Sequence, residues 1–152
     1  MIQNKILFTI FMFLIINQKL FSINLDELIL EPGFKISIYA DNLDSPRQMV
    51  EGKNGTIFVG ERSGQVIALI DSDNNGQADS KIIIAKDLTY STGISFLNGD
   101  LYFSEISKIW KIENIEEWIS KYNNIDSNFP EKILVVDNLP DDKWHGWKWL
   151  KH

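Results

Sequence analysis

The sequence predicts an all-β fold made of repeated four-stranded units. Short runs of β-branched and aromatic residues, separated by turn residues, follow one another from about residue 34 onward, which is typical of strands joined by hairpins. The pattern also repeats, because Asn98-Gly99 follows Asn54-Gly55 at a distance of 44 residues and stands before a similar strand. A period of roughly 40–50 residues with four strands per unit indicates the blades of a β-propeller.

The composition narrows the class of protein. Of the 152 residues, 44% are hydrophobic and 24% are charged, which indicates a folded globular chain. The net charge of -6 argues against a nucleic-acid groove. The absence of cysteine excludes disulfides, cysteine-based zinc sites and a cysteine nucleophile.

Residues 1–22 are expected to be a secretory signal peptide, and residues 23–152 the exported domain. Lys5 gives a positive start, and the run from Ile6 to Ile16, apolar apart from Thr9, is 11 residues long. A helix that spans a bilayer needs about 20 apolar residues, so this run is short. Cleavage near Ser22 predicts a periplasmic or secreted protein with no stable membrane insertion. The alternative is an uncleaved N-terminal anchor.

The first unit is expected after a separate strand at Phe34 to Ala40. Asn54-Gly55 stands between alternating apolar residues, which is a strong signal for a hairpin. The expected strands of this unit are Gln48 to Glu51, Thr56 to Glu61, Gln65 to Ile70 and Lys81 to Ala85.

The second unit follows the same pattern. Asp100 to Glu105 matches Thr56 to Glu61 with the glutamates in register, and Lys108 to Ile112 is the next expected strand. Lys132 to Leu139 matches Lys81 to Leu88 at an offset of 51 residues, so the second unit carries an insertion.

The insertion is expected to be a short helix. Asn114 as N-cap, with Glu117 three residues later, suggests a capping box. Ile115, Trp118 and Ile119 share one face at helical spacing, so Trp118 is expected to pack rather than to bind a ligand.

Three polar residues are expected at equivalent places where blades begin. Counting from the Asn-Gly turns pairs Gln48 with Thr92, and matching Gly93 to Phe96 with Gly146 to Trp149 adds His145. The first strand of each blade lines the central channel of a propeller, so these side chains should ring one mouth of it. A histidine there suits a general base, because its pKa lies near neutrality. The alternative is a set of channel-lining groups bonded to water.

Closure of the ring is a further expectation. Lys151-His152 falls within the first strand of a third blade, and a propeller closes its ring to protect its strand edges. We therefore expect two blades and the start of a third, as part of a longer propeller. Phe34 to Ala40 would then be the outer strand of the last blade.

Several short motifs carry information beyond the repeat pattern. The most specific is the His-Gly-Trp-Lys run from His145 to Lys148 after Leu139-Pro140. The others are Pro32-Gly33-Phe34, Leu43-Asp44-Ser45-Pro46-Arg47, Gly60-Glu61-Arg62 and Gly99-Asp100-Leu101-Tyr102. Together these motifs resemble the soluble quinoprotein glucose/sorbosone dehydrogenases, over about Glu31 to the end and about the N-terminal third of such a protein.

The resemblance implies a six-bladed propeller that binds pyrroloquinoline quinone and calcium and oxidises an aldose, with an external electron acceptor. It implies that His145 is the general base and that Gln48 contacts the sugar. The family usually has Asp or His where this chain has Trp144, whose ring could stack on a sugar face or signal a changed substrate. The family's quinone and calcium ligands lie in later blades, so this portion alone is expected to be inactive.

Two alternatives to this function stay open. One is a propeller without catalysis that binds a sugar or a protein partner. The weaker one is a metal-dependent lactonase-like propeller, which needs acidic residues in the channel.

The segment from Asp71 to Asp79 resembles an EF-hand calcium loop. Asp71, Asp73, Asn75 and Asp79 stand at ligand positions 1, 3, 5 and 9, with a glycine at the turn. Position 12 is Ile82 instead of a bidentate glutamate, so weak binding at most is expected. The favoured alternative is an Asx-rich turn between two strands.

Overall fold

The computed structural model describes residues 24–123, 128–142, 144 and 146–152, in two compact units, 1–37 and 38–152. The expected signal peptide lies outside the described residues. Across the described ranges, no helix is both long and apolar enough to cross a bilayer. The first unit holds a short 3-10 helix, η1 (Leu25–Glu27), which Asn24 caps by accepting a hydrogen bond from the Asp26 N–H.

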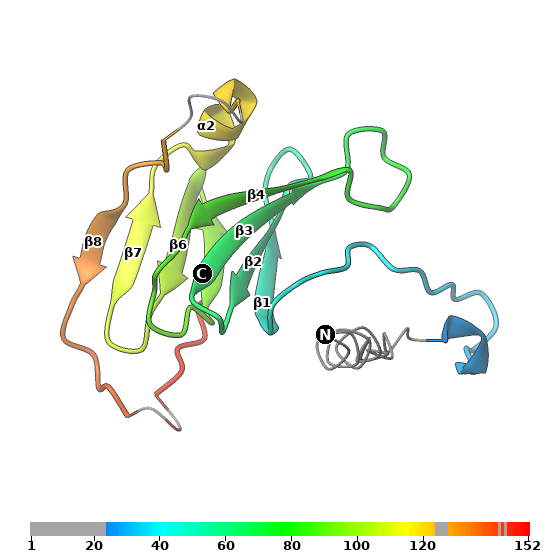
Figure 1. Cartoon of the computed structure of the whole chain (residues 1–152), viewed down its shortest axis with the longest axis horizontal. Coiled ribbons are helices and arrows are strands. Elements are labelled where there is room, and N and C mark those ends of the chain that lie inside the picture. Colours follow the sequence, from blue (N-terminus) through cyan, green and yellow to red (C-terminus); the bar gives the residue numbers. More distant parts are fainter. Residues whose placement is uncertain (1–23, 124–127, 143, 145) are drawn as a thin grey trace, which may run out of the picture. The chain divides into compact units, whose positions relative to one another are not determined.

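The second unit contains two four-stranded antiparallel sheets, which confirms the predicted blades of an incomplete β-propeller (Figure 1). Both sheets are meanders, in which each strand pairs with the next along the chain. The first sheet consists of β1 (Pro46–Glu51), β2 (Ile57–Glu61), β3 (Gln65–Ile70) and β4 (Ser80–Ala85). The second consists of β5 (Ile94–Leu97), β6 (Asp100–Ser104), β7 (Ile109–Ile112) and β8 (Ile133–Val136).

The strand predicted at Phe34 to Ala40, as the outer strand of the last blade, stays a prediction, because its expected partner belongs to neither of the two sheets. These residues form no ladder with any described strand. An extended segment becomes a strand only when a neighbouring backbone satisfies its N–H and C=O groups. Here the Tyr39 carbonyl accepts a bond from the Ala78 N–H, and Tyr39 and Ala40 pack on the face of the first sheet formed by Val59 and its neighbours.

The main core lies between the two sheets. Phe58 of β2 and Phe103 of β6 are fully buried, and Phe58 stacks on Phe96 of β5 with ring centroids 5.9 Å apart. Burial of apolar surface between neighbouring blades is therefore the main force that holds them together. The buried members of this core are Phe58, Val66, Ala68, Ile82, Ile84, Ala85, Leu88, Ile94, Leu101, Phe103, Ile112 and Ile115.

The two Asn-Gly hairpins differ by one residue. Asn98 and Gly99 both have positive φ angles, 53° and 95°, and join paired residues Leu97 and Asp100 in a two-residue turn. The loop around Asn54-Gly55 has three residues, 53–55, because the Gly52 N–H bonds to the Thr56 carbonyl at 2.8 Å. This difference shifts the predicted correspondence between the blades.

The shift is visible at the inner strands. Gln48 is opposite Gly60, whereas Ser104, the counterpart of Gly60, bonds through its N–H to the Gly93 carbonyl at 2.9 Å. The structural counterpart of Gln48 is therefore Gly93, one residue after the predicted Thr92.

The insertion is a helix, α2 (Ile115–Lys121), at the end of the second sheet opposite the connection that follows β8 (Figure 1). The predicted apolar face is confirmed, with Ile115 buried and Trp118 and Ile119 packed on the core. The predicted capping box is wrong. Asn114 has a left-handed backbone (φ 46°) and makes no side-chain cap, and the Ile115 N–H instead bonds to the Gly99 carbonyl.

Candidate functional site at the blade entrances

Each blade is entered through a connection that is held by backbone bonds to the turns between the second and third strands of the blades. The Arg62 N–H donates to the Ser45 carbonyl at 3.0 Å, and 44 residues later the Ile106 N–H donates to the Thr89 carbonyl at 3.1 Å. The predicted ends of the connections behave alike too. Leu88 and Leu139 each donate a backbone bond of 3.0 Å to a turn carbonyl of the preceding β-hairpin. The repeat therefore fixes the start of each inner strand.

Two buried glutamates also hold the entrances, and we call these glutamates and the backbone bonds above the entrance frame. Glu61 is 3% exposed and accepts a bond from the Asp44 N–H at 2.9 Å. Glu105 is 9% exposed and accepts from the Thr89 N–H and from the indole N–H of Trp110, both at 2.7 Å. A carboxylate is stable in such a place only when it is hydrogen-bonded. Sequence reasoning missed this role, although two glutamates in register after equivalent strands were a signal for it.

Gln48 links three segments through its side-chain amide. Its Nε2 donates to the Leu150 carbonyl at 2.7 Å, and its Oε1 accepts from the N–H groups of Ile94 (3.2 Å) and Leu150 (3.3 Å). The residue is buried. The predicted contact of Gln48 with a sugar stays a prediction. Its hydrogen bonds also give Gln48 a structural role, because they join β1 to β5 and to the C-terminal segment.

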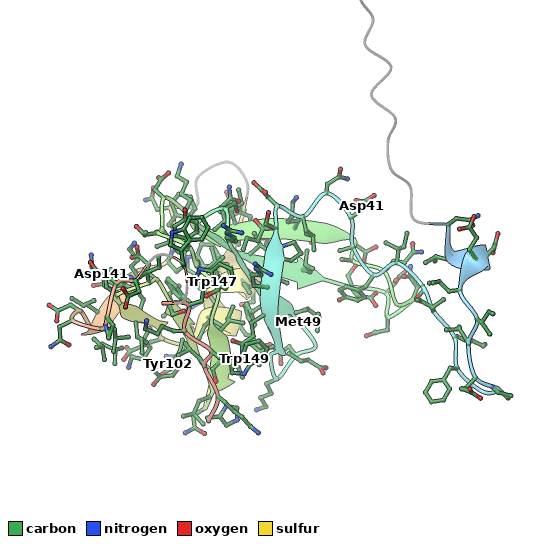
Figure 2. The ribbon with its side chains drawn as sticks, turned by 90° about the horizontal axis from the view of Figure 1, so that it is seen from below. Asp41, Met49, Tyr102, Asp141, Trp147 and Trp149 are labelled. Carbon is green, nitrogen blue, oxygen red and sulfur yellow. The ribbon has the colours of Figure 1, made fainter. Side chains whose placement is uncertain are left out.

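The C-terminal segment lies along the second blade. The Ser95 hydroxyl is 3.1 Å from Nδ1 of His152, and the Ser104 hydroxyl is 3.4 Å from the Lys148 carbonyl. Figure 2 shows Trp147 and Trp149 on this segment, beside β1 and its Met49. The segment forms no strand with a described neighbour.

The position of Lys148 changes the predicted register of the third entrance. In the first blade, a Cβ atom at Gly60 would lie 3.2 Å from the Thr92 carbonyl oxygen. In the second blade, the counterpart of Gly60 is Ser104, and its hydroxyl donates to the Lys148 carbonyl at 3.4 Å. Lys148 therefore takes the place of Thr92, three residues later than the sequence match had placed it. The connection into the third segment is longer than the other two.

The predicted base, His145, lies outside the described residues, so its role stays a prediction. Next to it in the chain, the Gly146 N–H donates to the Asp142 carbonyl at 2.6 Å. A Cβ atom at Gly146 would lie 2.3 Å from the same carbonyl oxygen, so this position requires glycine. Trp144 is 81% exposed. Its predicted stacking on a sugar also stays a prediction.

Both arginines of the chain lie at the entrances. The guanidinium carbon of Arg47 lies 4.7 Å from the centroid of the Trp147 ring, and that of Arg62 lies 5.1 Å from it. Arg62 also lies 5.5 Å from the ring of Tyr90. The sequence analysis did not predict this cluster. A signal for it was present, because the chain has only two arginines and both stand in motifs of the first blade.

The predicted calcium loop forms between β3 and β4. Carboxylate oxygens of Asp71, Asp73 and Asp79 lie within 4.8 Å of one another. All three also accept local bonds: Asp71 from the Asn75 and Gly76 N–H groups, Asp73 from Asn75, and Asp79 from Ser72. The hydrogen bonds from the hydroxyl and N–H of Ser72 hold the pKa of Asp79 below its usual value. This geometry is typical of an Asx-rich turn, and calcium binding stays a prediction.

Comparison with known sequences gives one relative without an assigned function. The chain matches no protein-family profile. It is 30% identical over 123 residues to an uncharacterized protein of Borreliella burgdorferi, a match that covers 78% of this chain. The match spans 31% of the length of that relative.

Comparison with solved structures shows the fold. The holo form of the PQQ domain of pyranose dehydrogenase from Coprinopsis cinerea has a TM-score of 0.56 at 17% identity, over 73% of this chain and 25% of that one. The calcium structure of the Trichoderma reesei carbohydrate-active enzymes family AA12 has a TM-score of 0.56 at 19% identity, over 74% and 27%. The iodide structure of that family has 0.55 at 19%, over 72% and 27%. The described blades thus share the fold of about a quarter of these chains.

Proposed function

We propose that these blades belong to an exported quinoprotein sugar dehydrogenase of the glucose/sorbosone type. The observation that carries the proposal is the likeness of the fold to the holo PQQ domain of a pyranose dehydrogenase. The sequence from Leu139 to Lys148 supports it, because it contains the histidine of the family motif and the exposed Trp144.

Each residue of the entrances has a proposed task. His145 takes the proton of the sugar hydroxyl that is oxidised, Trp144 stacks on the sugar ring, and Gln48 contacts the sugar from the first blade. Bound pyrroloquinoline quinone supplies the acceptor for the hydride, and the protein positions the sugar and removes the proton. Calcium, a periplasmic or secreted location and an external electron acceptor belong to the same proposal.

The test is a dye-reduction assay with added quinone and calcium, over a panel of aldoses, on the protein that carries these blades in a closed ring. The chain of 152 residues by itself is expected to be inactive. His145→Gln should lower turnover by about 10²- to 10⁴-fold, the usual contribution of a positioned base, with quinone affinity nearly unchanged.

His152→Gln is the matched control, because His152 is the other histidine and its ring bonds to Ser95 rather than facing the third entrance turn. Nearly full turnover of His145→Gln on a sugar that the parent oxidises would remove His145 from the chemistry. Equal losses in both histidine variants would also contradict its role as the base.

A second candidate function is sugar binding without catalysis. Trp144 and Trp149 are 81% and 73% exposed, and such rings can hold sugars by stacking. Binding of an aldose by the closed-ring protein, without dye reduction in the presence of quinone and calcium, would favour this candidate. The lactonase-like alternative gains no support, since the one acidic cluster found among the described residues lies in the turn between β3 and β4.

A further inference from the structure

The two arginines of the chain meet at one indole ring. The chain has 13 lysines but only Arg47 and Arg62 as arginines, and both guanidinium groups lie within 5.1 Å of the Trp147 centroid. Arg47 is at the irregularity of β1, Arg62 follows β2, and Trp147 and Tyr90 come from the connections into the third segment and the second blade. Side chains from three entrances therefore form one cluster.

The charge of this cluster is not balanced within the described part of the chain. The ion pairs found there involve Lys111 and Lys121, and none involves either arginine. The aromatic rings attract the cations, but they carry no negative charge. Two arginines that share one ring, and that form no ion pair within the described residues, can attract an anion.

The choice of arginine points to the shape of the anion. A lysine would supply an equal charge, and the chain uses lysine elsewhere. The planar fork of a guanidinium matches the two oxygens of a carboxylate or phosphate, and stacking on a ring holds that fork in place. The Trp147 ring is 38% exposed, so the cluster is open to solvent.

Unused hydroxyl groups lie in the same connection as Tyr90. Ser91 and Thr92 are 0% and 5% exposed, and neither side-chain oxygen has a hydrogen-bond partner among the described residues. Buried hydroxyls normally have one. Ser91 and Thr92 follow Tyr90 directly in the chain, in the connection into the second blade.

We propose that Arg47 and Arg62, held on Trp147, bind the anionic group of an acidic monosaccharide, either a sugar carboxylate or a sugar phosphate. The assignment to a sugar rests on the proposed function above. The anion lies at the guanidinium forks, and the sugar ring lies in the mouth that the three entrances surround. The preferred substrate is therefore an acidic sugar rather than a neutral aldose.

The test is binding measured by NMR on the ¹⁵N-labelled chain without quinone. A chain with two arginines gives two side-chain Nε–H signals, which single substitutions assign. Glucuronate and glucose 6-phosphate are titrated separately, with glucose, acetate and inorganic phosphate as references at equal ionic strength. At least one acidic sugar should shift both arginine signals and the Trp147 indole signal saturably, and the references should require much higher concentrations.

Substitutions distinguish the contribution of the planar guanidinium group from that of its positive charge. Arg47→Gln and Arg62→Gln should each weaken binding of the acidic sugar about tenfold or more, the effect of one charge-assisted hydrogen bond. Arg62→Lys should weaken it nearly as much, because the charge stays and the fork is lost. Lys53→Gln, which removes an exposed charge in the β1–β2 hairpin, should leave binding unchanged. Amide spectra identify any variant that has lost its fold, and Arg62→Lys then carries the test.

The contrary outcomes are equally clear. Equal shifts with glucose would assign the cluster to neutral sugars, and equal shifts with acetate or phosphate would leave only unspecific attraction. Shifts with pyrroloquinoline quinone but with neither acidic sugar would assign the arginines to the cofactor. Binding of an acidic sugar to this chain, with no oxidation of any sugar by the closed-ring protein with quinone and calcium, would contradict the proposed function and support this inference. Oxidation of aldoses by the closed-ring protein, without binding of an acidic sugar at the arginines, would do the reverse.

Discussion

The third blade entrance differs from the first two in its length and in the bonds that hold it. From Leu43 to Gln48 and from Leu88 to Gly93 the chain takes five residues, whereas the third connection needs about twice as many to run from Leu139 to the matching place after Lys148. The short connections hold their blades by backbone bonds. The extra length of the third carries Trp144, His145 and Trp147, which are the candidates for function.

This difference separates the residues that stabilise the fold from the residues that are candidates for function. The entrance frame has nearly the same hydrogen bonds in both blades. A substitution in it should therefore affect unfolding of the whole compact unit 38–152. The third entrance is held by a few contacts, from Gln48, Ser104 and Lys148, so a change there should act locally. Substitutions in the two regions can test this division.

The largest effect is expected from the core between the blades. Phe58→Ala should lower the free energy of unfolding by about 3–5 kcal/mol, because the ring is fully buried and stacks on Phe96. Urea unfolding followed by tryptophan fluorescence measures the change. Phe34→Ala, at a ring that is 73% exposed, is the control and should have little effect. Equal effects would show that the blades do not depend on this shared core.

The next effect is expected from the buried glutamates of the frame. Glu61→Ala leaves the Asp44 N–H without its acceptor and should cost about 1–3 kcal/mol in urea unfolding. Glu105→Ala should cost more, since it removes acceptors from both Thr89 and Trp110. Glu113→Ala, at an exposed carboxylate, serves as the control. A cost in one blade without the other would contradict the equivalence of the two entrances.

A smaller, local effect is expected at the third entrance. Gln48→Leu removes the bonds from the amide to Ile94 and Leu150, so the C-terminal segment should open while both sheets stay folded. Hydrogen exchange should become about tenfold faster at the Leu150 amide, the loss expected for about one hydrogen bond. Amides of β2 and β3 are the internal control. Equal acceleration there would mean that Gln48 belongs to the frame.

The sequence predicted the frame well, because repetition is visible in it. Strand patterns and turn residues located all eight strands of the two blades, and the glutamates marked the same place in both. The strand at Phe34 to Ala40 stays a prediction for the opposite reason. Its residues favour extended backbone, but a ladder depends on a partner that local pattern does not reveal.

The candidate site was harder to predict, because its geometry depends on small differences in length. One extra residue in the Asn54-Gly55 loop moved the counterpart of Gln48 from Thr92 to Gly93. The longer third connection moved the match of Thr92 to Lys148. The cluster of Arg47, Arg62 and Trp147 joins positions up to 100 residues apart, which spacing in the sequence could not bring together.

The smallest effect is expected in the acidic turn between β3 and β4. The pKa of Asp79 is lowered in the folded chain, so its charged form stabilises the turn fully above the usual value of 3.8, and the contribution disappears as the pH falls through the lower folded value. Asp79→Asn mimics the protonated form at neutral pH and should speed hydrogen exchange at the Ser72 amide, with no change in β1 to β3. Asp137→Asn, at an exposed carboxylate, is the matched control. If added calcium slowed exchange at Ser72 in the parent but not in Asp79→Asn, the turn would be a metal site, whereas equal rates with and without calcium would leave it an Asx turn.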